Sequence, residues 1–427
     1  MKENALQAQP RPRGGVRMAM LMSQYPAISH TFLLAEVLGL RREGFHVETV
    51  SINPPDRPLH ELPPAEAEEA RTTKYLKSGF AAQMLRLAGI MLRHPVVVLR
   101  GVAASMQYGA WDLGLQAWGL AYLAEGLLLG DWMRRRKLDH LHIHFGSSVA
   151  TVGYLGAKAW KIPYSMTMHG PNEYFDMRAY RLLTKFSAAE FVISISDFGR
   201  WNAMFLLPSH QWHKVRVCRL GIYPEKFESV ARPQPGEDRE LHLLCVGRLV
   251  PDKGQRILLR AVKALHQQGM RFRLTLVGRG IEREALEQYA SAHQLPVTFT
   301  GALDHDTTLA LVQTADVFVL PSFAEGIPIA LMEAMAACVP CVSTTACGIP
   351  ELIRHGEDGL LVPPGDESLL AESLRRLLLD EALRAQLGEA GRRRVLADYN
   401  LEENIPRKAR LLEEMLADAR HGRRRGA

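Results

Sequence analysis

Residues 317–345 read VFVLPSFAEGIPIALMEAMAACVPCVSTT, and this stretch decides the class of the fold. The short apolar runs at its two ends, residues 317–322 and 341–345, are typical of buried parallel strands. The run between them is typical of a helix, and since Pro328 suits the first turn, we expect the helix to begin near Ile327 or Pro328. A strand, a helix and a second strand in this order form the repeating unit of a parallel sheet.

The same alternation of short and long apolar segments extends in both directions along the chain. We predict strands at residues 17–26, 47–52, 140–146, 164–170, 191–196, 214–221, 241–249, 273–278, 297–301, 317–322, 341–345 and 359–364. The sequence ARPQPGEDRE at residues 231–240 interrupts the pattern and is rich in Pro and charge, as linkers are. The sequence therefore predicts an α/β protein with two doubly wound, Rossmann-like parallel-sheet domains, residues 17–230 and 241–399, whose sheets face a central cleft.

The net charge of +6 lies in the two ends of the chain. Residues 1–16 carry a charge of +2 and residues 420–427 carry +4, so the chain between them is neutral by count. We predict a disordered tail at 1–16 and a disordered basic tail at 420–427, and we expect no nucleic-acid partner. The amino-terminal segment has no apolar core of signal-peptide length and the chain has five cysteines, an odd number, so we expect a cytosolic protein.

Residues from about 65 to 137 show no convincing strand and form a predicted helical excursion. Two interpretations remain open. The helices pack on the first domain, or they lie on the inner face of the cytoplasmic membrane, as a peripheral membrane contact. In the second case aromatic side chains would lie at the interface and a basic run would meet anionic lipid: Trp111, Trp118, Tyr122 and Trp132, with Arg134, Arg135, Arg136 and Lys137.

Two carboxylates flank the start of the helix in the opening stretch. Glu325 precedes it in a loop, beside Gly326, which lets a ligand approach the backbone closely. Glu333 lies five residues past Pro328, about 7.5 Å along the helix axis, so we expect both acids to border one pocket. A helix amino terminus attracts anions, and a diphosphate bound there would place a sugar near Glu325 and a nucleoside near Glu333.

The complementary cations follow the first strand of the second domain. Arg248 and Lys253 lie in the sequence VGRLVPDKG, on a loop beside the expected diphosphate position. Solvated surface cations are the alternative interpretation of these two residues, and only the neighbouring anion site favours the functional one.

These motifs resemble the retaining glycosyltransferases of family 4, which have the two-domain fold called GT-B. The resemblance rests on GRLVPDKG at 247–254, EGIPIALMEAMA at 325–336, and GIPELI with GEDGLLVPPGD at 348–366. In the first domain QYPAISHTFLLAEV, HIHFG and MTMHGPNEYF resemble the subgroup that builds exopolysaccharides such as colanic acid. The chain departs from its relatives at SQYPAIS, where many have a glycine-rich loop, and at His30, where the subgroup often reads SETF.

The resemblance implies a role for each matching residue. Arg248 and Lys253 would hold the donor diphosphate with the backbone around Gly326, Ile327 and Pro328. Glu325 and His169 would contact the donor sugar as catalytic residues, and Glu333 would take the ribose. Ser29, His30 and His144 are candidate acceptor-side residues. The resemblance also implies that a final helix, residues 400–419, crosses back to the first domain.

No metal or other cofactor is expected beyond the nucleotide-sugar co-substrate. His140, His142 and His144 share one face of a strand, as ligands can, but no acid or cysteine near them in the sequence completes a metal site. The D-x-D sequence at 304–306 precedes a helix and is interpreted as a helix cap.

The sequence thus predicts a metal-independent retaining hexosyltransferase of polysaccharide biosynthesis. Its partners would be a nucleotide-diphosphate sugar and a saccharide or lipid-linked saccharide acceptor. The alternatives are a sugar-nucleotide epimerase or phosphorylase of the same fold, and a non-catalytic, membrane-associated sugar-nucleotide-binding protein.

Overall fold

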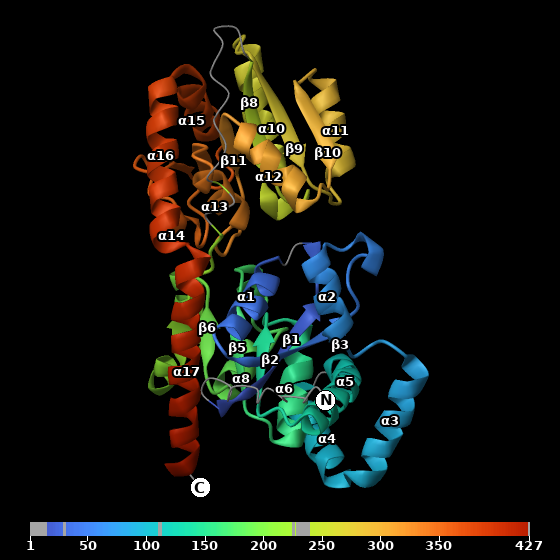
Figure 1. Ribbon diagram of the computed structural model, residues 1–427. Coiled ribbons are helices and arrows are strands. Elements are labelled where there is room, and N and C mark those ends of the chain that lie inside the picture. Colours follow the sequence, from blue (N-terminus) through green and yellow to red (C-terminus); the bar gives the residue numbers. More distant parts are fainter. Residues whose placement is uncertain (1–14, 29–30, 110–112, 224–226, 228–239, 426–427) are drawn as a thin grey trace, which may run out of the picture.

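The computed structural model describes residues 15–28, 31–109, 113–223, 227 and 240–425. They form two α/β domains, one above the other in Figure 1, each built on a parallel sheet. The α/β, GT-B-type architecture predicted from the sequence is confirmed. Among the described residues all twelve predicted strands are present.

The first sheet has seven strands in the order β3-β2-β1-β4-β5-β6-β7, and all of its pairings are parallel. The strands are β1 (Arg17–Gln24), β2 (His46–Asn53), β3 (Lys74–Tyr75), β4 (His140–His144), β5 (Tyr164–Met168), β6 (Val192–Ser194) and β7 (Val215–Val217). The helices are α1 (Thr31–Arg42), α2 (Pro64–Thr72), α3 (Phe80–Arg93), α4 (Pro95–Gly109), α5 (Leu113–Arg136), α6 (Ser148–Trp160), α7 (Asn172–Phe175), α8 (Leu182–Ala188) and α9 (Asp197–Leu206), with short 3₁₀ turns at Leu59–Glu61 and Ser209–Lys214.

The central strand β1 is almost entirely apolar in sequence because both of its faces are covered. Ala19 and Leu21 pack with α4, α5 and α6 on one face of the sheet, while Met18, Met20 and Met22 pack with α1 on the other. All five side chains are fully buried. A strand that is covered on both faces must be apolar at every position, because successive side chains point to opposite faces.

The second sheet has six strands in the order β10-β9-β8-β11-β12-β13, again all parallel. They are β8 (Leu241–Val246), β9 (Phe272–Val277), β10 (Val297–Gly301), β11 (Val317–Leu320), β12 (Cys341–Thr344) and β13 (Leu360–Val362). The helices are α10 (Gln255–Gln267), α11 (Arg283–Ala292), α12 (His305–Thr314), α13 (Ile329–Ala336), α14 (Ile349–Leu352), α15 (Glu367–Leu379) and α16 (Glu381–Asp398). The 3₁₀ turn at Pro251–Lys253 follows β8.

The last helix, α17 (Leu401–Arg425), leaves the second domain and runs along the first (Figure 1). Its apolar face, which includes Ala409, Leu412 and Met415, packs in the same core cluster as β1 and α1. The prediction of a disordered arm from residue 420 is wrong as far as Arg425, because the helix continues through the basic residues. Arginine is a good helix former, and cations in the last turn favour the helix dipole.

The expectation of no strand over residues 65–137 is also wrong, since β3 pairs with β2 at Val50 and Ser51. A two-residue strand has no periodicity to detect, and only its sheet partner creates it. Most of the segment is helical as predicted, and Leu123, Leu127 and Leu129 of α5 are core residues. Among the described residues no single helix is long and apolar enough to span a bilayer.

Candidate active site

The loops that follow β8 and β11 meet at the carboxyl edge of the second sheet. The Lys253 ammonium lies 2.5 Å from Oε1 of Glu325, and the Ser322 hydroxyl donates to the same oxygen at 2.9 Å. Gly254 allows this contact: its φ is +69°, and a Cβ there would lie 2.1 Å from the Pro321 carbonyl oxygen. Only glycine accepts both the left-handed backbone and so close an approach.

The two predicted cations lie in different environments. The side chain of Lys253 is 14% exposed, whereas that of Arg248 is 62% exposed and reaches Asp252 only at 4.0 Å. The backbone at Arg248 is held, because the Gln255 side chain donates to its carbonyl oxygen at 2.8 Å. Lys253 is therefore positioned before any ligand arrives, while the Arg248 side chain extends into solvent.

The helix after Glu325 begins slightly later than predicted, at Ile329, with Pro328 in the cap position. No side chain caps this end of α13, so its first backbone N–H groups are available to an anion. Ile327 does not face the ligand region, because it is buried in the core of the second domain.

Gly326 brings the two domains into contact. A Cβ at Gly326 would lie 2.3 Å from the carbonyl oxygen of His169, which follows β5 in the first domain. The backbone of Gly326 is pressed from the other side by Gly348, whose added Cβ would lie 1.8 Å from the Gly326 carbonyl oxygen. Two predicted site residues from opposite domains thus meet at backbone distance.

A chain of buried polar groups leads away from His169 into the first domain. Nε2 of His169 lies 2.9 Å from Nδ1 of His144, and Nε2 of His144 lies 3.6 Å from Oε1 of Glu36. The other oxygen of Glu36 lies 2.5 Å from the Lys408 ammonium of α17. His144, a candidate acceptor-side residue, is fully buried and contacts His169 rather than solvent. Its acceptor-side role stays a prediction.

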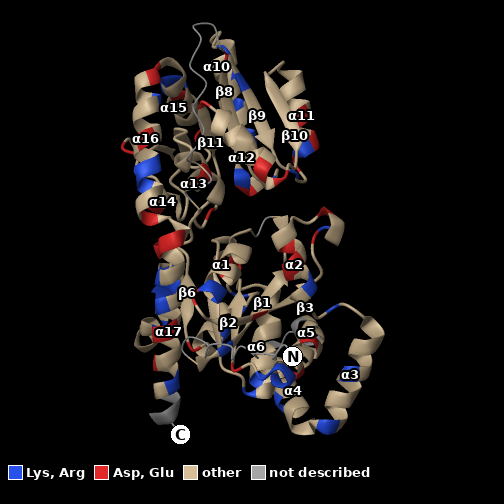
Figure 2. Cartoon of the chain, viewed as in Figure 1, with Lys and Arg blue, Asp and Glu red and all other residues tan. Residues whose placement is uncertain are grey.

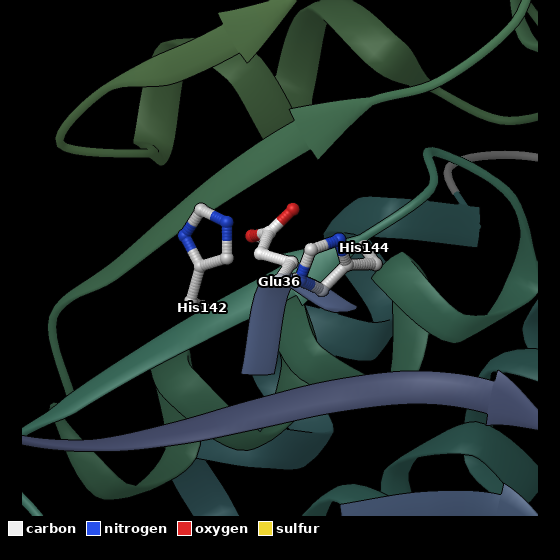
Figure 3. Close-up of side chains that lie close together, drawn as sticks. All are labelled: Glu36, His142 and His144. Carbon is white, nitrogen blue, oxygen red and sulfur yellow. Dashed lines mark ion pairs between the residues drawn. The ribbon is translucent and has the colours of Figure 1, made fainter. Parts of the chain in front are cut away.

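An acid does lie beside the strand histidines, contrary to the expectation from the sequence. Figure 3 shows Glu36, from α1, between His142 and His144, all three buried. Both ring nitrogens of His142 are already hydrogen-bonded, Nδ1 to Ser165 at 2.7 Å and Nε2 to Thr167 at 2.8 Å. Oε2 of Glu36 is paired with the Lys408 ammonium, while Oε1 of Glu36 lies 3.6 Å from Nε2 of His144.

Glu173 is a positioning residue that sequence reasoning missed, although it lies in the quoted motif MTMHGPNEYF. Its carboxylate accepts from the backbone N–H groups of Gly146, of His169 at 2.9 Å and of Gly170 at 3.2 Å. Burial raises the pKa of Glu173 to about 7, and these three hydrogen bonds oppose the shift. Burial also lowers the pKa of the nearby Lys185 to about 7. An acid four residues after a histidine at a strand end was the available signal.

Glu333 borders a large cavity between the domains, with a volume of about 1010 Å³. Its second-domain wall includes His305, whose Nδ1 lies 3.7 Å from Oε1 of Glu333. The first-domain wall is mostly apolar, and α1 contributes Phe32 and Leu38 to it. Glu325 does not line this cavity, so the two acids of the opening stretch face different regions.

The D-x-D sequence is a helix cap, as predicted. The Asp304 carboxylate accepts from the Thr307 backbone N–H at 2.9 Å at the start of α12. Asp304, His305 and Asp306 also line the large cavity, a role that the cap interpretation did not include. Ser29 and His30 lie outside the described residues.

Glu351 of α14 ties the domains together. Its two carboxylate oxygens accept from the backbone N–H groups of Asp197 and Phe198, each at 2.8 Å, at the start of α9 in the first domain. The relative position of His169 and Glu325 therefore depends on a charge-assisted cap that crosses the domain boundary.

Replacing Lys253 by alanine is expected to weaken nucleoside-diphosphate binding by about 1.5 to 3 kcal/mol, because a charge-assisted contact is lost. Arg248→Ala should weaken binding in the same direction. Calorimetry with free nucleoside diphosphate measures both effects, and Lys263→Ala, on the next helix, is the matched control. Unchanged affinity in both site variants would reject this position for the diphosphate.

Comparison with known proteins finds a family match in the second domain. Residues 228–394 match the family model "Glycosyl transferases group 1". The amylovoran biosynthesis glycosyltransferase AmsK of Erwinia amylovora is 29% identical over 424 residues, covering 94% of this chain and 100% of its own. WcaL of Escherichia coli, named as a colanic acid biosynthesis glycosyltransferase, is 27% identical over 421 residues, with coverage of 94% and 100%.

Solved structures support the fold over both domains. Sucrose-phosphate synthase of Thermosynechococcus elongatus superimposes with a TM-score of 0.69 at 21% identity, covering 94% of this chain and 100% of its own. The Anabaena protein HepE, in complex with UDP, has a TM-score of 0.68 at 16% identity, with coverage of 93% and 100%. This chain therefore has a GT-B fold and resembles glycosyltransferases over nearly its whole length, and its residues 228–394 match the group 1 family model.

Proposed function

We propose that this protein is a retaining glycosyltransferase that moves a hexose from a nucleotide-diphosphate sugar to a saccharide or lipid-linked saccharide in polysaccharide biosynthesis. The main support is the pairing of Lys253 with Glu325 beside the contact between Gly326 and His169. This arrangement places a cation, Lys253, and a carboxylate that can accept hydrogen bonds from sugar hydroxyls, Glu325, beside the start of α13. His169 of the opposite domain lies next to them.

The proposed reaction depends on stabilising the negative charge of the departing diphosphate. Departure of the nucleoside diphosphate develops negative charge, which Lys253, Arg248 and the first N–H groups of α13 would stabilise. Glu325 would accept hydrogen bonds from sugar hydroxyls, since a carboxylate is acceptor-only. The acceptor oxygen would then bond to the anomeric carbon on the face from which the diphosphate departs, and its proton would pass to the departing phosphate oxygen, so that the anomeric configuration is retained. His169, held by Glu173 and His144, would contact the sugar from the first domain.

The relatives support the two substrates separately. AmsK and WcaL are named for the biosynthesis of amylovoran and colanic acid, which favours a polysaccharide pathway. HepE structures hold UDP, UDP with glucose, and UDP-glucose, which favours a nucleotide-diphosphate sugar. We place the reaction in the cytosol, at the inner face of the cytoplasmic membrane, where a lipid-linked acceptor would be presented.

Product analysis tests the proposal. The protein is incubated with a panel of nucleotide sugars and lipid-linked saccharides, and the new glycosidic linkage is assigned by NMR. Transfer with the donor's anomeric configuration is the expected result. An inverted linkage would contradict the retaining course, whereas an epimerised donor, phosphorolysis or binding without turnover would contradict transfer.

Replacing Glu333 by alanine is expected to weaken the donor and the free nucleotide equally, by about 1 to 3 kcal/mol, because a ribose hydroxyl loses a buried partner. Affinities for nucleoside diphosphate and nucleotide sugar are compared with the melting temperature of the variant. Glu284→Ala, on α11, is the control. Lower stability without a selective loss of affinity would show that Glu333 supports the fold only.

Turnover is expected to persist in EDTA, because Lys253, Arg248 and the α13 terminus supply the positive charge that a metal would otherwise provide. Initial rates are measured before and after chelation, and again after Mn²⁺ is added back. Activity that falls with EDTA and returns with Mn²⁺ would contradict the metal-independent course.

A further inference from the structure

The helices α3 and α4 form a bent hairpin, in which α3 projects from the first domain and α4 packs on α5 and α6 (Figure 1). Their axes differ by 104° at the break before Pro95, and the pair has the length and composition of a broken membrane span. Most of α3 has no protein cover, since only Gln83 and Ile90 are buried along it. The hairpin is therefore apolar in sequence, with α3 largely exposed and α4 exposed on the side that does not pack on α5 and α6.

The exposed side chains of the hairpin are large and apolar. Leu92 is 83% exposed and Phe80 is 75% exposed, whereas core residues of the same type are fully buried. On α4 the exposed positions recur at helical spacing, opposite a face that packs through Val97, Ala104 and Tyr108. The apolar face consists of Phe80, Met84, Leu85, Met91, Leu92, Val96, Leu99 and Met106. Large apolar side chains exposed in such number on one pair of helices are typical of an interaction site.

The charge around this face has one sign. Between residues 72 and 111 the sequence has five cations, Lys74, Lys77, Arg86, Arg93 and Arg100, and no aspartate or glutamate. Figure 2 shows basic segments in blue on an otherwise tan hairpin. Neither Arg86 nor Arg93 forms an ion pair with any residue that the structure describes.

A small cavity of about 360 Å³ lies between α3 and α5, beside the apolar face. Arg86, Arg93 and Arg135 line it together with His94, and the one acid in its wall, Asp131, is paired with Arg135 at 2.8 Å. Partial burial, with Arg86 and Arg135 nearby, lowers the pKa of Lys74. Positive charge is thus concentrated where the hairpin joins the body of the domain.

We propose that the α3–α4 hairpin is a membrane-binding surface, whose apolar face enters the interface of an anionic bilayer and whose arginine-lined cavity holds a lipid phosphate. An apolar face bordered by unneutralised arginines matches the acyl and headgroup layers of such a bilayer. A protein partner would need acidic side chains placed opposite these arginines, whereas an anionic bilayer presents phosphate groups over its whole surface. This inference goes beyond the transfer reaction and does not depend on it.

The membrane-binding residues differ from those that the sequence suggested. Trp132 is buried, Arg134 lies 5.2 Å from the Trp160 ring centroid, and Arg136 is paired with Glu48. Trp118 is exposed but stacks on Tyr122 in α5, and Trp111 lies outside the described residues. Most of the exposed large apolar side chains of this segment lie on the hairpin before α5, and Trp118 and Leu120 of α5 add to them.

Vesicle co-sedimentation of the full chain, without donor or acceptor, tests the proposal. Wild-type protein is expected to sediment with phosphatidylglycerol-containing vesicles, less with pure phosphatidylcholine, and less at high salt. Leu85→Glu/Leu92→Glu should lower the partition more than about ten-fold, since two apolar anchors are lost and charge is added. Arg86→Glu/Arg93→Glu should do the same on anionic vesicles, because each cation contributes roughly five-fold.

The matched controls carry equivalent changes on the second domain. Ile281→Glu alters an equally exposed apolar residue, and Arg375→Glu/Arg393→Glu alters two surface arginines. Both are expected to sediment as the wild type does, and all variants should keep the wild-type melting temperature, because the altered side chains are exposed. Equal sedimentation of hairpin and control variants would overturn the proposal. Wild-type protein that does not sediment with the vesicles would overturn it as well. In that case, a dimer in sedimentation velocity that Leu85→Glu/Leu92→Glu dissociates would assign the apolar face to a second copy of the chain.

Discussion

Replacing Glu325 by glutamine is expected to lower turnover about 100- to 1000-fold while free nucleoside diphosphate still binds. Glu325 lies in the loop after β11, and its carboxylate is only 13% exposed, against Lys253 and Ser322. In the carboxylate, one oxygen accepts from Lys253 and Ser322 and the other can accept from sugar hydroxyls. In the amide, an NH2 group that only donates replaces one of these two oxygens. The Glu325 carboxylate would no longer compete with the diphosphate for the Lys253 ammonium, so the affinity for the diphosphate should stay the same or rise.

Steady-state kinetics and calorimetry on the same preparations separate these two effects. Glu284→Gln, on an exposed surface of α11, is the control and should retain wild-type turnover. A Glu325→Gln variant with full transfer activity would show that this acid belongs to the fold alone. A parallel loss of turnover and of diphosphate affinity would instead assign it to donor binding.

Replacing Lys408 by methionine is expected to destabilise the first domain by about 3 to 5 kcal/mol, because the Glu36 carboxylate would stay buried without its cation. The two side chains are 7% and 5% exposed and lie 2.5 Å apart, so solvent does little to screen the charge that remains. The Lys408 ammonium also anchors α17 to α1, at the far end of the chain of groups that leads through His144 to His169. Urea unfolding followed by circular dichroism measures the loss.

Two further variants show whether the buried charge is the cause. Glu36→Gln/Lys408→Met removes both charges and should recover most of the lost stability. Arg407→Met breaks the neighbouring, half-exposed pair with Glu403 in the same helix and should change stability by less than about 0.5 kcal/mol. If the single and double variants at the buried pair are equally unstable, lost packing rather than an uncompensated charge explains the effect.

The sheets could be predicted from the sequence because their strands are buried on both faces. Such strands appear as short, continuous apolar runs, and the helices between them repeat every three or four residues. The residues next to each position also predicted the helix cap at Asp304 and the loop position of Glu325. Local reasoning failed at β3, where the signal was too short, and at the end of α17, where a basic run was interpreted as disordered although arginine is a good helix former.

The residues of the candidate site were named from the sequence, but their grouping was not. Sequence spacing predicted one pocket for Glu325 and Glu333, whereas the structure directs Glu325 to Lys253 and Glu333 to His305. Eight residues along a loop and a helix leave the directions of two side chains undetermined.

The sequence by itself determined the class of the fold and its division into two parallel-sheet domains, and its motifs named the candidate donor-side residues, because these depend on patterns within short stretches. Tertiary structure alone decided that Glu36, His144, His169 and Lys408 form one buried chain of polar groups. These four residues come from α1, β4, the loop after β5 and α17, so no local pattern joins them. Contacts between residues far apart in the chain arise only when the elements pack, and burial then decides which polar groups must pair.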